Sequence, residues 1–408
     1  MKKLLLFLAS IGPGLFLIGY NIGTGSITTM ASAGAAYGMQ MILPVLLSCL
    51  FTYFLIVVFG QYTIVTGQTV LYSYRTHFGT PLTLLVLASL LFSEWVSCMG
   101  VMGIVVEIVQ EWSRPLTPSG RGFSQVVLAA LFGAVIYWLF WQGRHRFFER
   151  VLTVFVALMG LSFLLTMFMV IPEPADVLNG LAPNIPEDSN GLLLLAGMVG
   201  TTMGGILYVV RSILVQEKGW TMNDFRLEKR DAAVSATLMF VLSFAIMACA
   251  AGTLFPRGLR VVNAIDMVQL LEPLAGRFAI SIFVTGIVCA GLSSLFPIVL
   301  LAPWLLADFN GRPRDMRSTQ ARLLVLFGVL LGLVVPLFGG RPVLVMIASQ
   351  AAASIATPLI LLLMLLLVNK PEVMGAHTAG PGRNLLMGLI LLFTVFMAGA
   401  GIVGLVGG

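Results

Sequence analysis

Glycines and hydroxyl-bearing residues interrupt the first long apolar segment of the chain, between Gly19 and Thr29. Gly23 and Gly25 weaken a helix there, and the neighbouring serine and threonines offer oxygen ligands. In lipid, backbone that leaves a helix is tolerated only against protein or a water-filled cavity. A helix broken at mid-membrane is therefore the best sequence indicator of a site that moves a solute. The alternative is close packing of two helices, for which Gly19 and Gly23 have the right spacing.

A second interruption of the same kind lies in the sixth apolar segment, where Gly204 and Gly205 follow two threonines. The two breaks are five spans apart, and because five is odd the two halves would face opposite ways across the membrane. Broken helices at matching positions of inverted halves are typical of a LeuT-type transporter. We therefore expect a central substrate site between the breaks. Its predicted residues are Asn21, Ile22, Gly23, Thr24, Gly25, Ser26, Thr202, Met203, Gly204, Gly205 and Gln350.

The composition is that of a protein with many membrane spans. Hydrophobic residues make up 59% of the chain and charged residues 10%, against roughly 25% charged in a soluble protein. The net charge of +6 comes from basic residues scattered between apolar spans, which does not favour nucleic acid as a partner. The four cysteines all fall in apolar spans and are interpreted as small buried side chains. Because no nucleophile–base pattern, phosphate loop or zinc motif stands out, we expect neither an enzyme nor a cofactor.

Spans of about 20 apolar residues cross a bilayer, and the sequence predicts eleven of them. The fold class is therefore all-α, with a first repeat at 1–171, a second at 191–368 and an additional helix at 385–406. The predicted spans are 5–36 (broken), 41–66, 82–110, 123–141, 148–171, 191–216 (broken), 232–255, 278–304, 320–338, 343–368 and 385–406.

The basic residues of the loops predict the orientation of these spans. With the N-terminus inside, the inner loops carry sixteen Lys and Arg and the outer loops six. We expect an integral protein of a bacterial plasma membrane, with a cytoplasmic N-terminus and an extracellular C-terminus. The Pro-rich, acidic segment 172–190 is expected to cross the outer surface as an extended connection.

Ionisable groups inside a span are costly and each calls for a partner or a function. Glu94 lies near the middle of the third span, and Glu107 lies near its outer end. Arg211 lies about two turns after the second break, where it either extends towards the cytoplasmic surface or forms a structural or gating ion pair, with Glu94 as one candidate partner. Gln350 in the tenth span is either an interhelical hydrogen-bond anchor or a ligand of the site.

An ordered series of short motifs resembles the Nramp family of divalent-metal transporters over nearly the whole chain. The resemblance implies a LeuT-type fold with eleven or twelve spans. The series is Gly12-Pro13-Gly14, Thr66-Gly67, Arg144 to Glu149, Ala157-Leu158-Met159-Gly160-Leu161-Ser162-Phe163, Val177-Leu178-Asn179-Gly180-Leu181-Ala182-Pro183, Gly197-Met198-Val199-Gly200-Thr201-Thr202, Ser349-Gln350 and Val373-Met374-Gly375.

The metal-binding motifs depart from this family. Its Asp-Pro-Gly-Asn motif aligns with Ile22 to Gly25, so both the carboxylate and the amide ligand are replaced. Its Met-Pro-His motif aligns with Gly204 to Ile206, with Met203 one residue early, and its second histidine aligns with Arg211. The matches that remain are Glu94 and Gln350, whereas two further acidic positions of the third span fall on Val101 and Ile104.

Three functions follow from these observations. The first is transport of a divalent cation such as Mg²⁺ or Mn²⁺, held through its water shell by neutral oxygens, with altered selectivity and altered proton coupling. The second keeps the fold but carries a small organic solute such as an amino acid or carboxylate, because a half-helix N-terminus favours an anionic group. The third is a membrane sensor that transports nothing.

Overall fold

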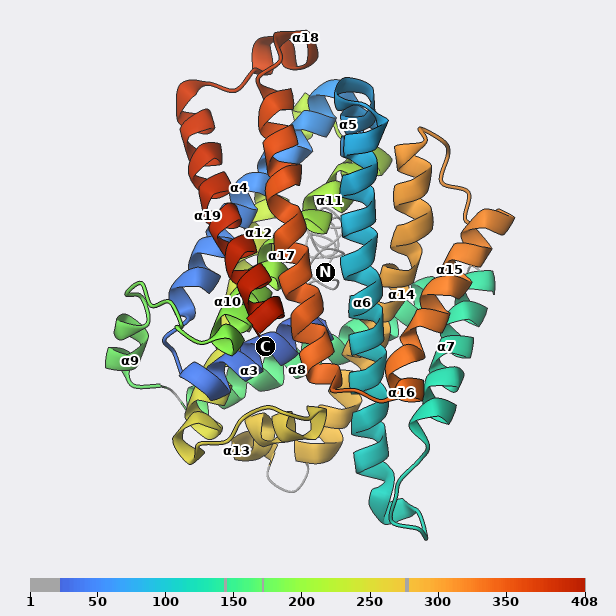
Figure 1. Cartoon of the computed structure of the whole chain (residues 1–408), viewed down its shortest axis with the longest axis vertical. Coiled ribbons are helices and arrows are strands. Elements are labelled where there is room, and N and C mark those ends of the chain that lie inside the picture. Colours follow the sequence, from blue (N-terminus) through green and yellow to red (C-terminus); the bar gives the residue numbers. More distant parts are fainter. Residues whose placement is uncertain (1–22, 143–144, 171, 276–278, 408) are drawn as a thin grey trace, which may run out of the picture.

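The computed structural model describes residues 23–142, 145–170, 172–275 and 279–407, and within these ranges the chain forms helices and no strand (Figure 1). Nine of these helices are long and apolar enough to cross a membrane. They are α4 (Ile42–Thr66), α6 (Thr80–Ser113), α7 (Gln125–Gln142), α10 (Ser189–Met203) continued by α11 (Gly205–Lys218), α12 (Phe225–Thr253), α14 (Ala279–Phe309), α15 (Thr319–Gly332) continued by α16 (Val334–Phe338), α17 (Pro342–Val368) and α19 (Pro381–Gly407).

Two further helices occupy the ranges predicted for the first and fifth spans. They are α3 (Thr24–Tyr37) and α8 (His145–Met169), whose apolar part runs from Val156 to Met169. The prediction of an all-helical membrane protein is confirmed. The prediction of an extended connection over 172–190 is wrong, because α9 (Pro174–Asn179) forms one helical turn within it. Pro174 in the first turn and Asp176 near the helix N-terminus both favour that turn.

Short helices mark the two ends of the bundle in Figure 1. The helices α5 (Val70–Phe78) and α18 (Pro371–Met374) lie at one end, and α13 (Glu272–Ala275) lies at the other. We call these the α5 end and the α13 end. Large apolar side chains such as Phe92, Trp138, Phe168 and Leu392 are exposed along the bundle, as expected for surfaces that face lipid.

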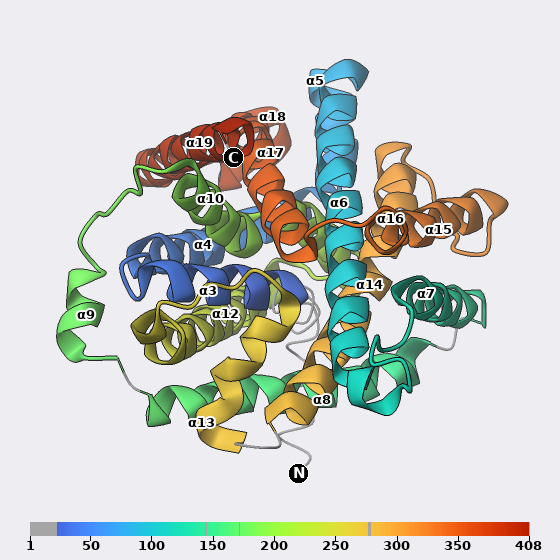
Figure 2. The same cartoon turned by 60° about the horizontal axis from the view of Figure 1, so that its bottom comes forward.

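The centre of the bundle is built from α3, α6, α10, α12, α14 and α17. The helix α17 packs against α6, α10 and α19, and α3 packs against both α10 and α12. Figure 2 shows α3 between α10 and α12, with α17 and α6 beside them. Glycines let these helices come into backbone contact, since a Cβ added at Gly200 would lie 1.8 Å from the carbonyl oxygen of Gln350.

Candidate functional site

The sixth predicted span is broken at Gly204, as the sequence predicts. The helix α10 ends at Met203, Gly204 adopts an extended conformation (φ −60°, ψ 136°), and α11 begins at Gly205. Hydroxyls from neighbouring helices satisfy backbone groups around the break. Thr52 of α4 donates to the carbonyl of Thr202 (2.9 Å), and the amide of Gly205 donates to Thr357 of α17 (2.9 Å). The break is therefore built into the packing of α4, α10 and α17.

The described part of the first span starts next to this break. The helix α3 begins at Thr24 with Gly23 as its extended N-cap residue. The preceding chain is outside the described residues, and the predicted site residues Asn21 and Ile22 fall there. Ser26 of α3 shares a hydrogen bond with Thr201 of α10 (2.8 Å between the hydroxyl oxygens). The N-terminal turn of α3 is thus joined to the last turn of α10.

A cavity of about 40 Å³ lies between the start of α3 and the break at Gly204. Its volume is enough for about three water molecules at roughly 10–15 Å³ each. Besides α3, α10 and α11, the helices α6, α14 and α17 contribute to its wall. The polar side chains on it are Ser93, Glu94, Ser97, Thr201, Ser294, Ser349 and Gln350, and backbone is presented at Gly23, Gly25, Gly200 and Gly204.

The structure brings some of the predicted site residues to this cavity and turns others away. Gly23, Gly25, Gly204, Gln350 and Glu94 lie on its wall.

Thr24, Ser26, Thr202, Met203 and Gly205 are not on the wall. Thr202 instead donates to Ser48 of α4 (2.7 Å), and Met203 is buried among apolar side chains. Consecutive residues of a helix point in different directions, so of the two threonines of α10 only Thr201 faces the cavity.

Sequence reasoning missed the serines that supply most of the hydroxyls. Ser93 and Ser97 are four residues apart on α6, on the same helix face and beside Glu94. That spacing was the available signal, although serines also occur at helix contacts for packing alone. The sulfur on the wall belongs to Met346 and not to Met203.

The donor set is dominated by oxygen. Glu94 is the single acidic residue among the described wall residues, and it is buried (5% exposed). Across the described ranges, no group of three or more His, Cys, Asp or Glu side chains could hold a metal ion. Hydroxyl, amide and carbonyl oxygens with one carboxylate suit a hard cation such as Mg²⁺ or Mn²⁺, whereas soft metals prefer thiolate or imidazole.

Arg211 does not pair with Glu94 and does not extend towards the surface. Its guanidinium is fully buried and forms a two-pronged contact with Glu228, with Nε–Oε1 at 3.1 Å and Nη2–Oε2 at 2.6 Å, and a further ion pair with Asp231. The sequence reasoning failed because α12 begins at Phe225, seven residues before the predicted start of the span. Glu228 and Asp231, predicted to lie in a loop, are therefore three residues apart on one buried helix face.

The bundle, its interrupted helix and the cavity at the interruption define a helical membrane protein with the LeuT-type fold. Within that class the chain belongs to the Natural resistance-associated macrophage protein-like (Nramp) family, whose model matches residues 14–404. The family resemblance predicted from the sequence motifs is confirmed.

Relatives named divalent metal cation transporter MntH are similar to this chain over almost its whole length. The protein of Erwinia tasmaniensis is 25% identical over 381 residues, which cover 90% of this chain and 87% of the relative. The protein of Pectobacterium carotovorum subsp. carotovorum is 25% identical over 403 residues, which cover 95% and 92%.

Solved structures show the same fold. A mutant of the manganese transporter of Eremococcus coleocola superposes with a TM-score of 0.73 at 14% identity, covering 96% of this chain and 85% of that one. MhsT in complex with L-phenylalanine superposes with a TM-score of 0.63 at 16% identity, covering 97% and 98%.

Proposed function

We propose that this protein is a secondary transporter that moves a divalent metal cation by alternating access through the cavity between Gly23 and Gly204. Membership of the Nramp family and the names of the MntH relatives support the class of cargo. The observation that carries the proposal is Glu94, a buried carboxylate on the wall of a cavity that is otherwise lined by neutral groups. Acidic residues within membrane spans are rare, and those that line a polar cavity mark ion or proton pathways.

The cargo that fits this wall is a hard dication that keeps part of its water shell, such as Mg²⁺ or Mn²⁺. Mg²⁺ loses water reluctantly and is usually held through one or two carboxylates together with several waters. Glu94 supplies one negative charge, and the serine hydroxyls and the amide of Gln350 supply hydrogen-bond partners for bound waters. The cavity has room for about three water-sized groups.

We further propose that the α5 end faces the cytoplasm. The segments between spans at that end carry Arg75 in α5, Arg314, Lys370 and other basic residues, as the positive-inside rule requires of a cytoplasmic surface. We propose with it that the N-terminus lies inside and the C-terminus outside a bacterial plasma membrane. The first repeat would then be residues 1–171 and the second residues 191–368, with α19 following them.

Uptake into proteoliposomes tests the proposal. Wild-type protein is expected to take up Mg²⁺ or Mn²⁺ with saturation. Glu94→Gln is expected to lower kcat/KM by about tenfold or more, the size of effect seen when a group that supports a bound metal is removed. Glu107→Gln is the matched control, because this glutamate of the same helix is not on the cavity wall and instead accepts from the amide of Ala264.

A different result of the uptake and binding experiments would contradict the proposed cargo. If no divalent cation is taken up or bound, and amino acids or small carboxylic acids raise the melting temperature instead, the proposal is wrong and the cargo is an organic solute.

A further inference from the structure

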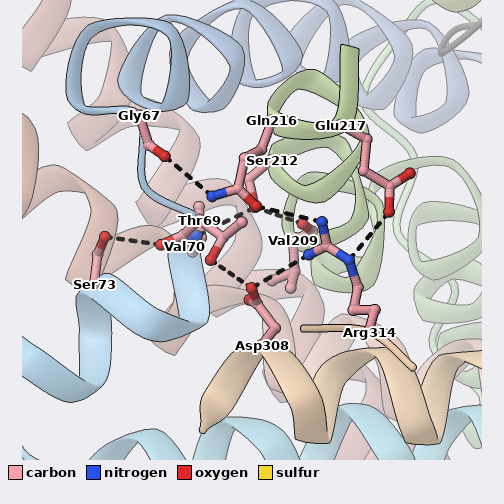
Figure 3. Close-up of polar contacts among 10 residues, drawn as sticks. All are labelled: Gly67, Thr69, Val70, Ser73, Val209, Ser212, Gln216, Glu217, Asp308 and Arg314. Atoms are coloured by element: carbon pink, nitrogen blue, oxygen red, sulfur yellow. Dashed lines mark hydrogen bonds and ion pairs between the residues drawn. The ribbon is translucent and has the colours of Figure 1, made fainter. Parts of the chain in front are cut away.

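A second polar cavity, of about 360 Å³, lies at the α5 end of the bundle. It is lined by Thr69 from the connection between α4 and α5, by Gln216 of α11, by Asp308 at the end of α14, and by Arg314 from the loop after α14 (Figure 3). Three regions that are far apart in the sequence, near residues 69, 216 and 308–314, therefore meet at one cluster of polar side chains.

Asp308 is the buried anion of this cluster. The residue is 5% exposed, and its Oδ1 accepts a hydrogen bond from the hydroxyl of Thr69. Its Oδ2 is buried and has no hydrogen-bond partner among the described residues. A carboxylate oxygen that is buried and unsatisfied costs free energy until a donor or a cation reaches it. Because Asp308 is on the wall of the cavity, that cation can come from the cavity itself.

Arg314 forms a long ion pair with Asp308. Its Nη1 lies 3.7 Å from Oδ1 of Asp308, whereas its Nε lies 3.0 Å from Glu217 and its Nη2 lies 3.3 Å from Gln216, both of α11. Figure 3 shows this arginine between the end of α14 and α11. At 3.7 Å this ion pair is longer than a hydrogen bond, although both side chains are largely buried (17% and 4% exposed). A dication bound directly to Asp308 would replace this long contact with a shorter and doubly charged one.

The same network holds α11 to the connection between α4 and α5. The side-chain amide of Gln216 donates to the carbonyl of Gly67 (3.0 Å), and the amide of Val70 donates to the hydroxyl of Ser212 (3.2 Å). Both contacts are drawn in Figure 3. With Arg314 in place, α11, α14 and the start of α5 are tied together at this end.

The cluster lies along the helices that line the central cavity. Ile206 of α11 and Ile298 of α14 are on the wall of the central cavity. On α11, Gln216 of the second cavity follows Ile206 by ten residues, and on α14, Asp308 follows Ile298 by ten residues. Ten residues of helix span about 15 Å. A cation that leaves the central cavity between α11 and α14 towards the α5 end therefore reaches Asp308 next.

We propose that Asp308 is a second cation-binding site on the route to the α5 end, occupied at rest by the tethered guanidinium of Arg314, and that the divalent cargo displaces Arg314 and so opens this end. The ligands are the Asp308 carboxylate, the Thr69 hydroxyl and the Gln216 amide oxygen, a hard set that suits Mg²⁺ or Mn²⁺. The inference rests on the proposed function for the identity of the cargo.

The test uses the full chain in inside-out membrane vesicles, with a reporter cysteine in the central cavity. Ala353→Cys is introduced after Cys49, Cys98, Cys249 and Cys289 have been replaced by alanine. The measured quantity is the rate at which a small, membrane-impermeant thiol reagent modifies the reporter from the α5 end. Thermal melts confirm that each variant is folded.

The first arm removes the tethered cation. Arg314→Gln is expected to raise the labelling rate about tenfold. The rate follows the fraction of molecules that are open at the α5 end, and we expect this fraction to rise about tenfold when the tether is lost. Arg312→Gln is the matched control, since Arg312 lines the same cavity and its side chain forms no hydrogen bond or ion pair to the described helices. Equal rates in the two variants and the wild type would overturn the inference.

The second arm adds Mg²⁺ or Mn²⁺ alone as the probe. Either ion is expected to raise the labelling rate in protein with Asp308 intact. Asp308→Asn should abolish this response, because its amide oxygen still accepts from Thr69 but carries no charge. A response that persists unchanged in Asp308→Asn would remove Asp308 as a cation site.

The two proposals fail in different ways. If the wild type takes up dications but Asp308→Asn responds to them as the wild type does, this inference is wrong and the proposed function stands. If no dication is taken up, but both arms behave as expected, the site at Asp308 stands and the proposed cargo is wrong.

Discussion

Glu94 gives the central cavity its chemical character. It is the single acidic side chain among the described wall residues, and the remaining polar groups there are hydroxyls, one amide and backbone. Glu94 neutralises one of the two charges of a dication. The other charge is stabilised by waters of the cation that hydrogen-bond to the hydroxyls of the wall. For this reason the wall suits a small, strongly hydrated dication better than a soft metal that needs anionic sulfur or imidazole ligands.

The sulfur on the wall provides a test of that argument. Met346→Leu preserves side-chain volume, and we expect it to change the affinity for Mg²⁺ by less than about twofold, since conservative swaps of this kind cost little. Calorimetric titration of the purified protein measures this directly, with Glu94→Gln as the variant that loses binding. A loss of binding in Met346→Leu as large as in Glu94→Gln would show that sulfur is a ligand.

Arg211 has a structural role that could not be inferred from its position in the sequence. It is fully buried between Glu228 and Asp231 and forms an ion pair with each of them. The backbone makes room for it, because a Cβ added at Gly60 would lie 2.0 Å from Oε1 of Glu228.

Arg211→Leu is expected to destabilise the protein by about 3–5 kcal/mol, because two buried carboxylates lose the guanidinium that pairs with both of them. Thermal melts in detergent measure the loss. Arg226→Leu, an exposed position of α12, should change little. Adding Glu228→Gln and Asp231→Asn to Arg211→Leu should recover part of the stability. If the single variant melts with the wild type, the triad does not stabilise the fold.

Among the elements, the pairing of α10 with α17 holds the break in place. The carbonyl of Gln350 lies where a side chain at position 200 would begin, and Thr357 of the same helix accepts from the first amide of α11. One helix thus supports both sides of the interruption at Gly204. The geometry depends on glycine at position 200 because the obstructing atom is backbone.

Gly200→Ala and Gly388→Ala are expected to have effects of opposite sign. At Gly200 the new methyl must push α10 and α17 apart, which costs typically about 1–3 kcal/mol and also lowers uptake. At Gly388 of α19 nothing lies within 4 Å, so alanine should stabilise the helix by about 0.4–1 kcal/mol. Melting temperatures of the two variants, measured side by side, check the prediction. A stable and fully active Gly200→Ala would contradict the packing described here.

A pH-dependent contact links α3 to the start of α10 at the α13 end. The hydroxyl of Tyr37 donates to Asp188 (2.8 Å), and this hydrogen bond, together with the amide of Gly191, lowers the pKa of Asp188 below its ordinary value of 3.8. A lowered pKa means that the contact stabilises the fold above that ordinary value and is lost as the pH falls through the folded value.

Thermal melts between pH 6 and pH 3 are expected to show a gap between the wild type and Tyr37→Phe that narrows at the acid end, where Asp188 becomes protonated. Asp188→Asn serves as the control, and its gap to the wild type should narrow over the same range. A gap that stays constant down to pH 3 would mean that Asp188 is not titrating through this contact.

The sequence predicts the helices well and their ends poorly, for a physical reason. Apolar runs long enough to cross a bilayer are unmistakable, and the glycines at 204 and 205 mark a true interruption. Where a helix extends beyond its apolar run, its charged residues resemble those of a loop. For this reason the sequence assigns Glu228 and Asp231 to a loop, although both lie in α12. Which threonine faces the cavity depends on helix rotation, and packing against α4 decides it for Thr202.

For the whole molecule, the two cavities are connected by shared helices. The central cavity is lined by the first turn of α11 and by the middle of α14, and the second cavity is lined by the ends of both helices at the α5 end. Closing or opening that end while the central break stays fixed is the kind of motion that alternating access requires. The fold, the family and the oxygen-rich wall therefore support the same account, transport of a hard dication.

Crystals soaked in Mn²⁺ test the central claim most directly, because anomalous scattering locates the metal without assumptions about its ligands. The account predicts a peak in the cavity between Gly23 and Gly204, in contact with the Glu94 carboxylate either directly or through one water. Crystals that take up Mn²⁺ elsewhere and leave this cavity without a peak, while the same protein binds Mn²⁺ in solution, would contradict it.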